Sequence, residues 1–321
     1  MEGNPKMKFK KEHVGLVVII AALLLYLSLR DTNKTHYTLP AVEPLEKSEI
    51  SKIIINKKDN KITLAENDGN WLIKPQNYAA DKQKVDRLLK EFSDFRLTGM
   101  VSESKLFSRY GLGEDNKINL QAFSGEDVKR DLYIGKTAST KRHTYVMLKD
   151  DTRIYEARNN IRNIFDKTID ELRDKNVLNF ETKSLRGLTI KTGDKSIEFE
   201  KSVVPQPVTP GEQEESPPRE PEVTWRTTEG KAGKPEVIKR IFRTLSNLQC
   251  DGYIEEKIKS DFTDPVYKIT VTGNETHTLS IFKKRDDGRY PAISSGSDYP
   301  FLLTEWKTKQ MMKEPEEFIV K

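Results

Sequence analysis

One stretch of this sequence occurs twice, and the repeat limits the chain to folds built from two related halves. Trp71 opens the first copy and Trp225 the second, each within a short run typical of a β-strand. A helix is predicted after each Trp, over 81–95 and over 234–249, with apolar residues spaced i, i+3, i+4, i+7 and i+10 along one face. These apolar stripes are Val85, Leu88, Leu89, Phe92, Phe95 and Ile238, Ile241, Phe242, Leu245, Leu248.

The match between the copies continues past the helices. Three residues of the first copy correspond to three of the second at one offset, 250 − 97 = 153; they are Leu97, Gly99, Val101 and Cys250, Gly252, Ile254. Two unrelated α+β domains that look alike by chance are the alternative. A shared stripe followed by matching residues favours a duplication.

Strand candidates flank both helices and set the fold class. Alternating polar and apolar residues joined by short polar turns predict hairpins. In the first copy the predicted strands are 51–56, 61–66, 71–74, 117–123, 128–135, 144–148 and 153–157; in the second they are 188–192, 196–200, 223–227, 266–272, 277–283, 289–294 and 301–304. Each copy then ends in a predicted helix, near 161–172 and 305–313. The pattern predicts an α+β fold made of two tandem copies of a mostly antiparallel sheet with a helix.

An apolar run near the N-terminus predicts a membrane anchor in front of the two copies. The uncharged segment Val14 to Leu29 has 16 residues. As a helix it covers about 24 Å, less than the roughly 30 Å of a hydrocarbon core, so flanking Lys10, Lys11 and Arg30 would have to reach the interfaces. A cleaved signal peptide and a buried soluble helix are the alternatives. The bulky residues after the run do not fit a cleavage site, and we expect an uncleaved transmembrane helix.

The charges around this run predict its orientation. Four lysines precede it and only Arg30 and Lys34 follow closely, so the N-terminus is expected in the cytoplasm and the body in the periplasm or outside the cell. The expected organisation is a cytoplasmic tail at 1–13, the single-pass anchor in the inner membrane at 14–29, a stalk at 30–49, a first repeat at 50–180 and a second at 181–321. The lipid bilayer is thus the first expected partner.

A proline-rich segment interrupts the second copy. Residues 202–222 contain six of the chain's 15 prolines and several glutamates. Such a composition cannot build a core, and we expect an extended or disordered loop. A tolerated surface insertion is favoured over a docking segment for a partner.

Composition and motifs point away from most chemistry. The formal net charge is +5 without a clustered basic stripe, so no nucleic-acid partner is expected. One cysteine, Cys250, excludes an intramolecular disulfide and a multi-cysteine metal site, and four scattered histidines form no metal-binding motif. Gly135-Lys136-Thr137 lacks the glycine of a phosphate-binding loop five residues earlier, where Arg130 stands. We expect no enzymatic activity, no cofactor, no metal and no identified small-molecule substrate.

Two groups of residues remain as candidates for binding. Arg173, Asp174 and Lys175 form a charged cluster at the end of the first copy, which either grips a partner or caps the boundary with solvated salt bridges. A module for cell-envelope glycans or another ligand would use exposed aromatic residues, for which Tyr290, Tyr299 and Trp306 are candidates, although core packing explains them as well. A hydrolase would need titratable groups converging in a pocket, and no pair of carboxylates is singled out.

With its predicted anchor, its repeat and several short motifs, the chain resembles an uncharacterised bacterial family, domain of unknown function 4340, over roughly residues 50–310. The residues that carry the resemblance are Trp71, Pro75, Asp81, Arg109, Tyr110, Gly111, Leu112, Ile134, Gly135, Tyr145, Tyr155, Leu172, Arg173, Asp174 and Lys175. The second copy keeps Trp225 but has Ser260-Asp261-Phe262 in place of Tyr110-Gly111-Leu112. The resemblance implies a single-span protein with an extracytoplasmic body, associated with gliding-motility-type ABC transport systems, and it brings no catalytic residue. The expected function is therefore a non-enzymatic accessory or scaffold protein that binds integral-membrane transporter subunits.

Overall fold

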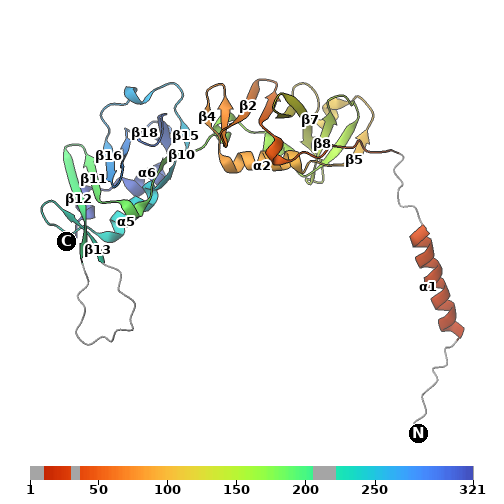
Figure 1. Cartoon of the computed structure of the whole chain (residues 1–321), viewed down its shortest axis with the longest axis horizontal. Helices are drawn as coiled ribbons and strands as arrows, with labels where there is room; N and C mark the ends of the chain where they lie inside the picture. The colour runs from red at the N-terminus through yellow and green to blue at the C-terminus, as the bar shows by residue number, and fades with distance from the viewer. Residues whose placement is uncertain (1–10, 30–36, 205–221, 321) are drawn as a thin grey trace, which may run out of the picture. The chain divides into compact units, whose positions relative to one another are not determined.

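The computed structural model describes residues 11–29, 37–204 and 222–320 (Figure 1). The chain forms two compact units, each discontinuous in sequence. We call residues 1–61 and 89–166 the first unit, and residues 62–88 and 167–321 the second unit. The predicted cytoplasmic tail lies outside the described residues, except for the helical residues 11–13.

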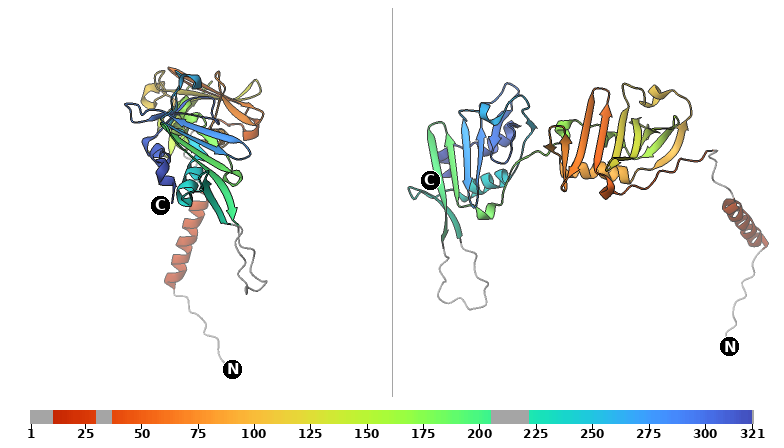
Figure 2. Two further views of the ribbon diagram at one scale, coloured as in Figure 1. Left: turned by 90° about the vertical axis from the view of Figure 1, so that its left-hand side faces the viewer. Right: turned by 45° about the horizontal axis from the view of Figure 1, so that its top comes forward.

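The strands form two large sheets whose neighbours run side by side (Figure 2). The nine-stranded sheet has the order β4-β3-β2-β1-β6-β7-β8-β9-β5. Its strands are β1 Lys52–Lys57, β2 Asn60–Asn67, β3 Asn70–Lys74, β4 Tyr78–Ala79, β5 Leu97–Ser102, β6 Ile118–Ser124, β7 Asp127–Thr137, β8 His143–Leu148 and β9 Ile154–Arg158.

The eight-stranded sheet has the order β13-β12-β11-β16-β17-β18-β19-β15. Its strands are β11 Gly187–Thr192, β12 Lys195–Val204, β13 Glu222–Thr227, β15 Gly252–Tyr253, β16 Tyr267–Thr272, β17 Thr276–Ile281, β18 Tyr290–Ser294 and β19 Phe301–Leu303. Apart from β4, the two sheets have the same connectivity strand for strand. Antiparallel pairing prevails in both sheets, as in the pairing of β11 with β12 and β16. The predicted α+β class with two mostly antiparallel sheets is confirmed, and the shared strand order supports the duplication.

The two predicted helices are present, and their apolar stripes are buried. α2 spans Lys82–Ser93, and α5 spans Pro235–Leu245, with a proline in its first turn where no backbone N–H is needed. Every residue of both stripes is at most 9% exposed. The prediction extended the second helix to Gln249, which is wrong. Residues Asn247–Gln249 form β14, which pairs with β10, Asn176–Asn179, so their backbone groups are bonded to a segment far away in sequence.

The predicted helix over 161–172 is interrupted. α3 spans Ile161–Phe165 and α4 spans Ile169–Leu172. The chain restarts at Thr168, whose side-chain oxygen accepts the N–H of Glu171 while the Glu171 carboxylate accepts the N–H of Thr168. This capping box begins a new helix and ends the old one. In the second copy α6 spans Glu305–Met311, close to its prediction.

Short 3-10 turns complete the described secondary structure. They are η1 Lys47–Glu49, η2 Phe107–Tyr110, η3 Thr182–Ser184, η4 Lys259–Asp261 and η5 Pro315–Phe318. They occur in matching places of the two copies: η1 precedes β1 as η3 precedes β11, and η2 follows β5 as η4 follows β15.

The N-terminal helix α1 spans Lys11–Leu29 and contains the predicted apolar run. Its large apolar side chains between Leu16 and Leu27 are 47–62% exposed. Within the described residues, no helix combines the length and the apolar character that crossing a membrane requires. The uncharged run Val14–Leu29, over which the anchor is predicted, covers about 24 Å of a hydrocarbon core of about 30 Å.

The described part of the expected stalk, 37–49, packs on the first unit. The hydroxyl of Tyr37 accepts a hydrogen bond from the backbone N–H of Met100 at 2.9 Å. Leu45 and Ile50 are 5% and 4% exposed. Residues 30–36 lie outside the described residues, as do residues 205–221 of the predicted proline-rich loop, whose two ends are strand in β12 and β13.

Candidate interaction loops

Each copy carries one loop with the same pattern of residues directly after its edge strand. The first loop, Glu103–Tyr110, follows β5 and reads ESKLFSRY; the second loop, Glu255–Phe262, follows β15 and reads EEKIKSDF. Five of the eight positions share their chemistry: an acid, a lysine, a branched aliphatic residue, a serine and an aromatic ring. Each loop contains a 3-10 turn, η2 or η4.

Both loops expose their aliphatic residue to solvent. Leu106 is 61% exposed and Ile258 is 66% exposed, and each precedes the 3-10 turn of its loop. The sequence of exposed and half-buried positions along the eight residues is identical in the two loops. A single exposed Leu is ordinary on a protein surface. The same exposure at the same place in two diverged copies indicates a surface that is used.

The first loop is held by tight packing of its C-terminal end on β7. Gly111 has φ +68°, and a Cβ there would lie 2.7 Å from the backbone nitrogen of Lys136. A Cβ on Gly135 would overlap the carbonyl oxygen of Tyr110 and lie 2.9 Å from Cγ of Leu112. Only glycine fits at these positions. Four residues selected from the sequence, Tyr110, Gly111, Leu112 and Gly135, thus form one cluster that fixes the first loop.

Two contacts reinforce this cluster. The rings of Tyr110 and Tyr145 meet edge to face, with centroids 5.0 Å apart. Nη1 of Arg162 donates to the carbonyl oxygens of Asn116 and Gly135, each at 2.9 Å. The first loop is therefore anchored at its C-terminal end and exposes Leu106 near its middle.

The second loop is held by a buried arginine. Arg173 is 2% exposed, and its guanidinium carbon lies 3.5 Å from the ring centroid of Tyr78 and 3.7 Å from that of Tyr253. Its Nη1 donates to Glu255, the first residue of the second loop. Tyr299 adds a third ring, 5.0 Å from the same carbon. We call these five residues the arginine clasp; all of them belong to the second unit.

The carboxylate of Glu255 joins the clasp through a second bond. The hydroxyl of Tyr78 donates to its other oxygen at 2.7 Å. This hydrogen bond, together with burial, raises the pKa of Tyr78, so the phenol stays protonated and keeps donating. A planar guanidinium stacked between rings and paired with a carboxylate fixes position as well as charge.

The neighbours of Arg173 in the charged cluster serve the local backbone. Nζ of Lys175 pairs with Asp170, and the carbonyl of Lys175 accepts the N–H of Cys250 at 2.8 Å. The carbonyl of Asp174 accepts the hydroxyl of Tyr253 at 2.7 Å. Burial raises the pKa of the Cys250 thiol to about 11, as in a structural rather than a reactive cysteine.

The remaining residues selected from the sequence lie elsewhere. Trp71 stands in β3, with Pro75 just after that strand, and Trp225 is buried in β13 with its ring 5.0 Å from that of Phe242. Among the described residues, neither a hydrogen bond nor a ring contact joins these three to either loop. These three residues therefore belong to the strands of the sheets or lie next to them, and they take no part in the two loops.

The three aromatic candidates for a ligand-binding surface lie in different surroundings. Tyr299 meets Tyr78 and Tyr253 edge to face in the arginine clasp, whereas, among the described residues, neither Tyr290 nor Trp306 shares a ring pair there. Trp306 is 70% exposed at the start of α6. These residues do not form a common surface with Tyr299 through ring contacts.

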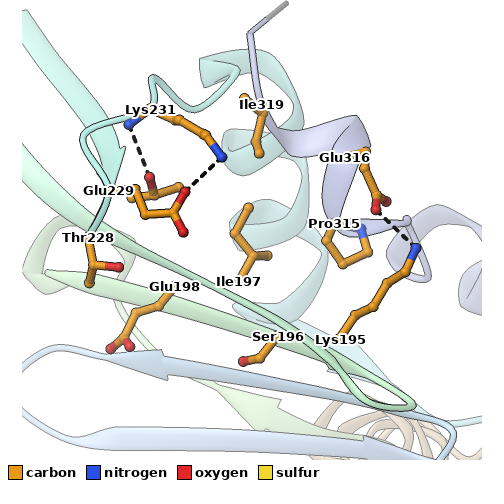
Figure 3. A pocket seen from close by; sticks show the side chains of 11 residues that line it. Lys195, Ser196, Ile197, Glu198, Thr228, Glu229, Lys231, Pro315, Glu316 and Ile319 are labelled. Atoms are coloured by element: carbon orange, nitrogen blue, oxygen red, sulfur yellow. Dashed lines mark hydrogen bonds and ion pairs between the residues drawn. The ribbon is translucent and has the colours of Figure 1, made fainter.

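An open hollow of about 390 Å³ lies on the second unit, beside the start of β12 and η5 (Figure 3). Four of its five charged side chains pair with one another: Lys195 with Glu316 at 2.9 Å and Lys231 with Glu229 at 2.7 Å. Paired charges leave little for a charged ligand to bind. Among the described residues, no group of three or more His, Cys, Asp or Glu is placed to hold a metal ion.

Sequence reasoning missed the loops and most of the clasp. The signal for the loops was present, because the copies align past Ile254 with an offset reduced by one, 258 − 106 = 152. Tyr78, Tyr253 and Glu255 carried no such signal, since only folding brings them to Arg173.

Comparison with known proteins yields one match. The model of the family described as "Domain of unknown function (DUF4340)" matches residues 71–267. No curated protein and no solved structure matches the chain.

Proposed function

The chain belongs to the DUF4340 family, and we propose that it is an accessory protein that binds integral-membrane subunits of a gliding-motility-type ABC transport system at the extracytoplasmic face of the bacterial cytoplasmic membrane. The observation that carries this proposal is the pair of matched loops with Leu106 and Ile258 exposed. A protein that works by docking needs such surfaces, and a duplicated one keeps them in both copies.

The loops indicate the chemistry of the partner. Each exposed aliphatic residue follows an exposed lysine, Lys105 or Lys257. An apolar side chain beside a cation suits a small apolar pocket with an acidic rim. Two like loops suit a partner that offers the same surface twice, as a symmetric dimer does.

In this proposal α1 keeps the chain at the membrane. Exposed apolar residues follow one another without a break from Leu16 to Ile20 and again from Leu23 to Leu27, so every side of the helix is apolar. A helix that is hydrophobic all round is stable when protein or lipid covers it. Accessibility of the loops to protease added outside intact spheroplasts tests the location of the body.

Site-directed photo-crosslinking in native membranes tests the partner. A photoreactive amino acid is placed at residue 106 or 258 of the full chain, and at residue 128 as the control, because Val128 is also apolar and 49% exposed but lies outside the loops. We expect transporter membrane subunits to be crosslinked from the two loop positions and not from residue 128. Absence of transporter subunits at both loop positions, or equal crosslinking from residue 128, would contradict the proposal.

A further inference from the structure

A second surface feature lies on the first unit, where β7, β8 and β9 end or begin. It is a hollow of about 420 Å³, lined by Lys141, Arg142, His143, Arg158, Asn159 and Asn160. We call it the basic hollow. The turn between β7 and β8 supplies Lys141 and Arg142, and His143 and Arg158 face each other across the β8–β9 pair.

The charges of the basic hollow are uncompensated. None of its lining residues carries a carboxylate. Within the described part of the chain, Lys141, Arg142 and Arg158 make no ion pair. The nearest acid that bonds to the lining is Glu91, which accepts from Nδ2 of Asn159 at 3.4 Å. Cations gathered on facing strands without an acid repel one another.

The corresponding turn of the second copy shows the alternative arrangement. Three of its four cations have an acid: Lys284 pairs with Glu305 at 2.8 Å, Arg285 with Asp287 at 3.8 Å, and Arg289 with Asp287 at 2.8 Å. A basic turn at this place in the fold is therefore compatible with internal neutralisation. The first copy leaves the counter-charge to be supplied from outside.

The backbone around the basic hollow is held in an unusual conformation. Lys141 has φ +58° and Asn159 has φ +71°, both in the left-handed region. For a non-glycine residue such as Lys141 this conformation is unfavourable, because Cβ crowds the following carbonyl oxygen. Strain of this kind persists where the surroundings impose it, and it is frequent at ligand-binding positions.

The donors present match a phosphoryl group. Two guanidinium groups offer forked N–H donors, Lys141 adds an ammonium, and the amide nitrogen of Asn160 is available because its oxygen accepts from Thr137 at 2.9 Å. Arginine forks fit phosphate oxygens two at a time. The hollow exceeds the size of a phosphate, which leaves room for an organic group attached to it.

We propose that the basic hollow binds a phosphoryl group, carried by a soluble phosphate ester or by the headgroup of an anionic phospholipid. Arg142 and Arg158 hold its oxygens, and Lys141 and the Asn160 amide complete the contacts. The site lies wholly within the first unit and is independent of the matched loops.

Calorimetric titration of the full chain in non-ionic detergent micelles tests the proposal. The probes are inorganic phosphate, glycerol 3-phosphate, and micelles doped with phosphatidylglycerol or with neutral phosphatidylcholine. Saturable binding of the soluble phosphates assigns a soluble ligand, and binding of phosphatidylglycerol alone assigns the lipid headgroup. No binding of any anionic probe, or equal response to phosphatidylcholine, overturns the proposal.

Charge-reversal variants locate the site. R142E/R158E is expected to weaken binding at least tenfold, because two charge-assisted hydrogen-bond donors are lost. R240E/R243E is the matched control: it makes the same change in net charge at two exposed arginines of α5, and it should change affinity less than about twofold. R142K/R158K keeps the charge without the fork and should give an intermediate loss. Equal losses in R142E/R158E and the control would overturn the assignment of these residues.

Discussion

The turn between β7 and β8 and the turn between β17 and β18 occupy the same place in two sheets of the same strand order, yet their cations differ in surroundings. In the first copy Lys141 and Arg142 have no acid beside them, whereas in the second Lys284 and Arg285 are paired. A duplicated fold keeps its core and lets its turns diverge. Differences between the turns therefore mark specialised surfaces, and an exposed feature kept by both copies marks a shared one.

The two matched loops illustrate both effects. Their exposed aliphatic residues are alike, but the first loop is fixed by glycine packing and the second by the arginine clasp. If selection acts on the exposed aliphatic residue, the contacts that hold each loop in place are free to differ between the copies. Each support gives a way to test whether the loops are equivalent.

The largest effect is expected from Gly135→Ala in the first copy. The new methyl group would overlap the carbonyl oxygen of Tyr110 and lie 3.2 Å from that of Tyr145, both backbone atoms that cannot move aside cheaply. We expect the free energy of unfolding of the first unit to fall by about 3 kcal/mol and hydrogen exchange to rise along the first loop. Hydrogen-exchange mass spectrometry with denaturant measures both.

Gly252→Ala in the second copy is the control for this variant. Its methyl group would meet only the Asp170 carboxylate, at 3.9 Å, an ordinary contact. We expect a change below about 1 kcal/mol. A cost as large as that of Gly135→Ala would mean that glycine packing does not distinguish the supports of the two loops.

The parts that sequence predicted are those whose signal is local. The apolar residues from Val85 to Phe92 and from Ile238 to Leu245 lie on buried helix faces. The runs of alternating residues form strands, because burial repeats with the period of the element. The same periodicity could not show where the second helix ends. Leu248 continues the helical spacing, but it lies in β14 opposite Leu178. Because Leu178 is distant in sequence, the local pattern around Leu248 could not predict this pairing.

The candidate site was predictable only in part, for the same reason. Tyr110, Gly111, Leu112 and Gly135 were selected from the sequence, and the structure brings them together. The arginine clasp draws its members from four separate segments between residues 78 and 299, which only the topology of the fold brings together. The exposure of Leu106 and Ile258 could not be predicted either, because an aliphatic residue is expected to be buried unless other evidence indicates exposure.

Arg173→Ala tests the support of the second loop. Loss of the stacked guanidinium leaves Tyr78 and Tyr253 facing a void and removes the cation paired with Glu255. We expect the second unit to lose about 2–3 kcal/mol of unfolding free energy, and Arg173→Lys about half of that, because an ammonium keeps the charge without the planar stack. Unfolding in urea followed by fluorescence of buried Trp225 reports this unit.

Hydrogen exchange in the two loops of the Arg173→Ala variant tests whether the clasp holds the second loop alone. Hydrogen exchange should rise along the second loop and stay unchanged along the first. A similar rise in both loops would show that the clasp does not act on the second loop specifically.

Each copy has a turn in which an aspartate bonds to an arginine two residues later, and the two aspartates are expected to contribute differently to the pH dependence of stability. Asp151 accepts from Arg153 at 2.7 Å and from the hydroxyl of Tyr155 at 2.6 Å, and the bonds to Arg153 lower its pKa most. A carboxyl group whose folded pKa lies below its unfolded value of about 3.9 stabilises the fold above that value and loses this contribution as the pH falls through the folded pKa. Asp151→Asn should therefore cost about 1–2 kcal/mol at pH 7, and the difference from wild type should narrow below pH 4.

Asp287→Asn is the control in the second copy: it changes the same type of ion pair, but in a different turn, between β17 and β18. Asp287 also bonds to an arginine two residues on, Arg289, but it has no tyrosine hydroxyl and lies on the surface. We expect no measurable change in the melting temperature at pH 7 or at pH 3. Thermal unfolding of both variants at both pH values measures this. Equal changes in melting temperature for Asp151→Asn and Asp287→Asn would contradict the expected difference between the two aspartates.

The smallest effect on stability, and the most direct test of equivalence, is expected from Leu106→Ser and Ile258→Ser. Both side chains are mostly in water, so each substitution should change the free energy of unfolding by less than about 0.5 kcal/mol. If the loops bind the same surface on a repeated partner, each single variant should lower recovery of the transporter subunits severalfold and the double variant should lower it by about the product of the two. Val128→Ser controls for the loss of an exposed apolar residue outside the loops. A loss confined to one loop would show that the other copy retained its aliphatic residue without binding through it, and the two copies would then differ in function as they do in the charge of their turns.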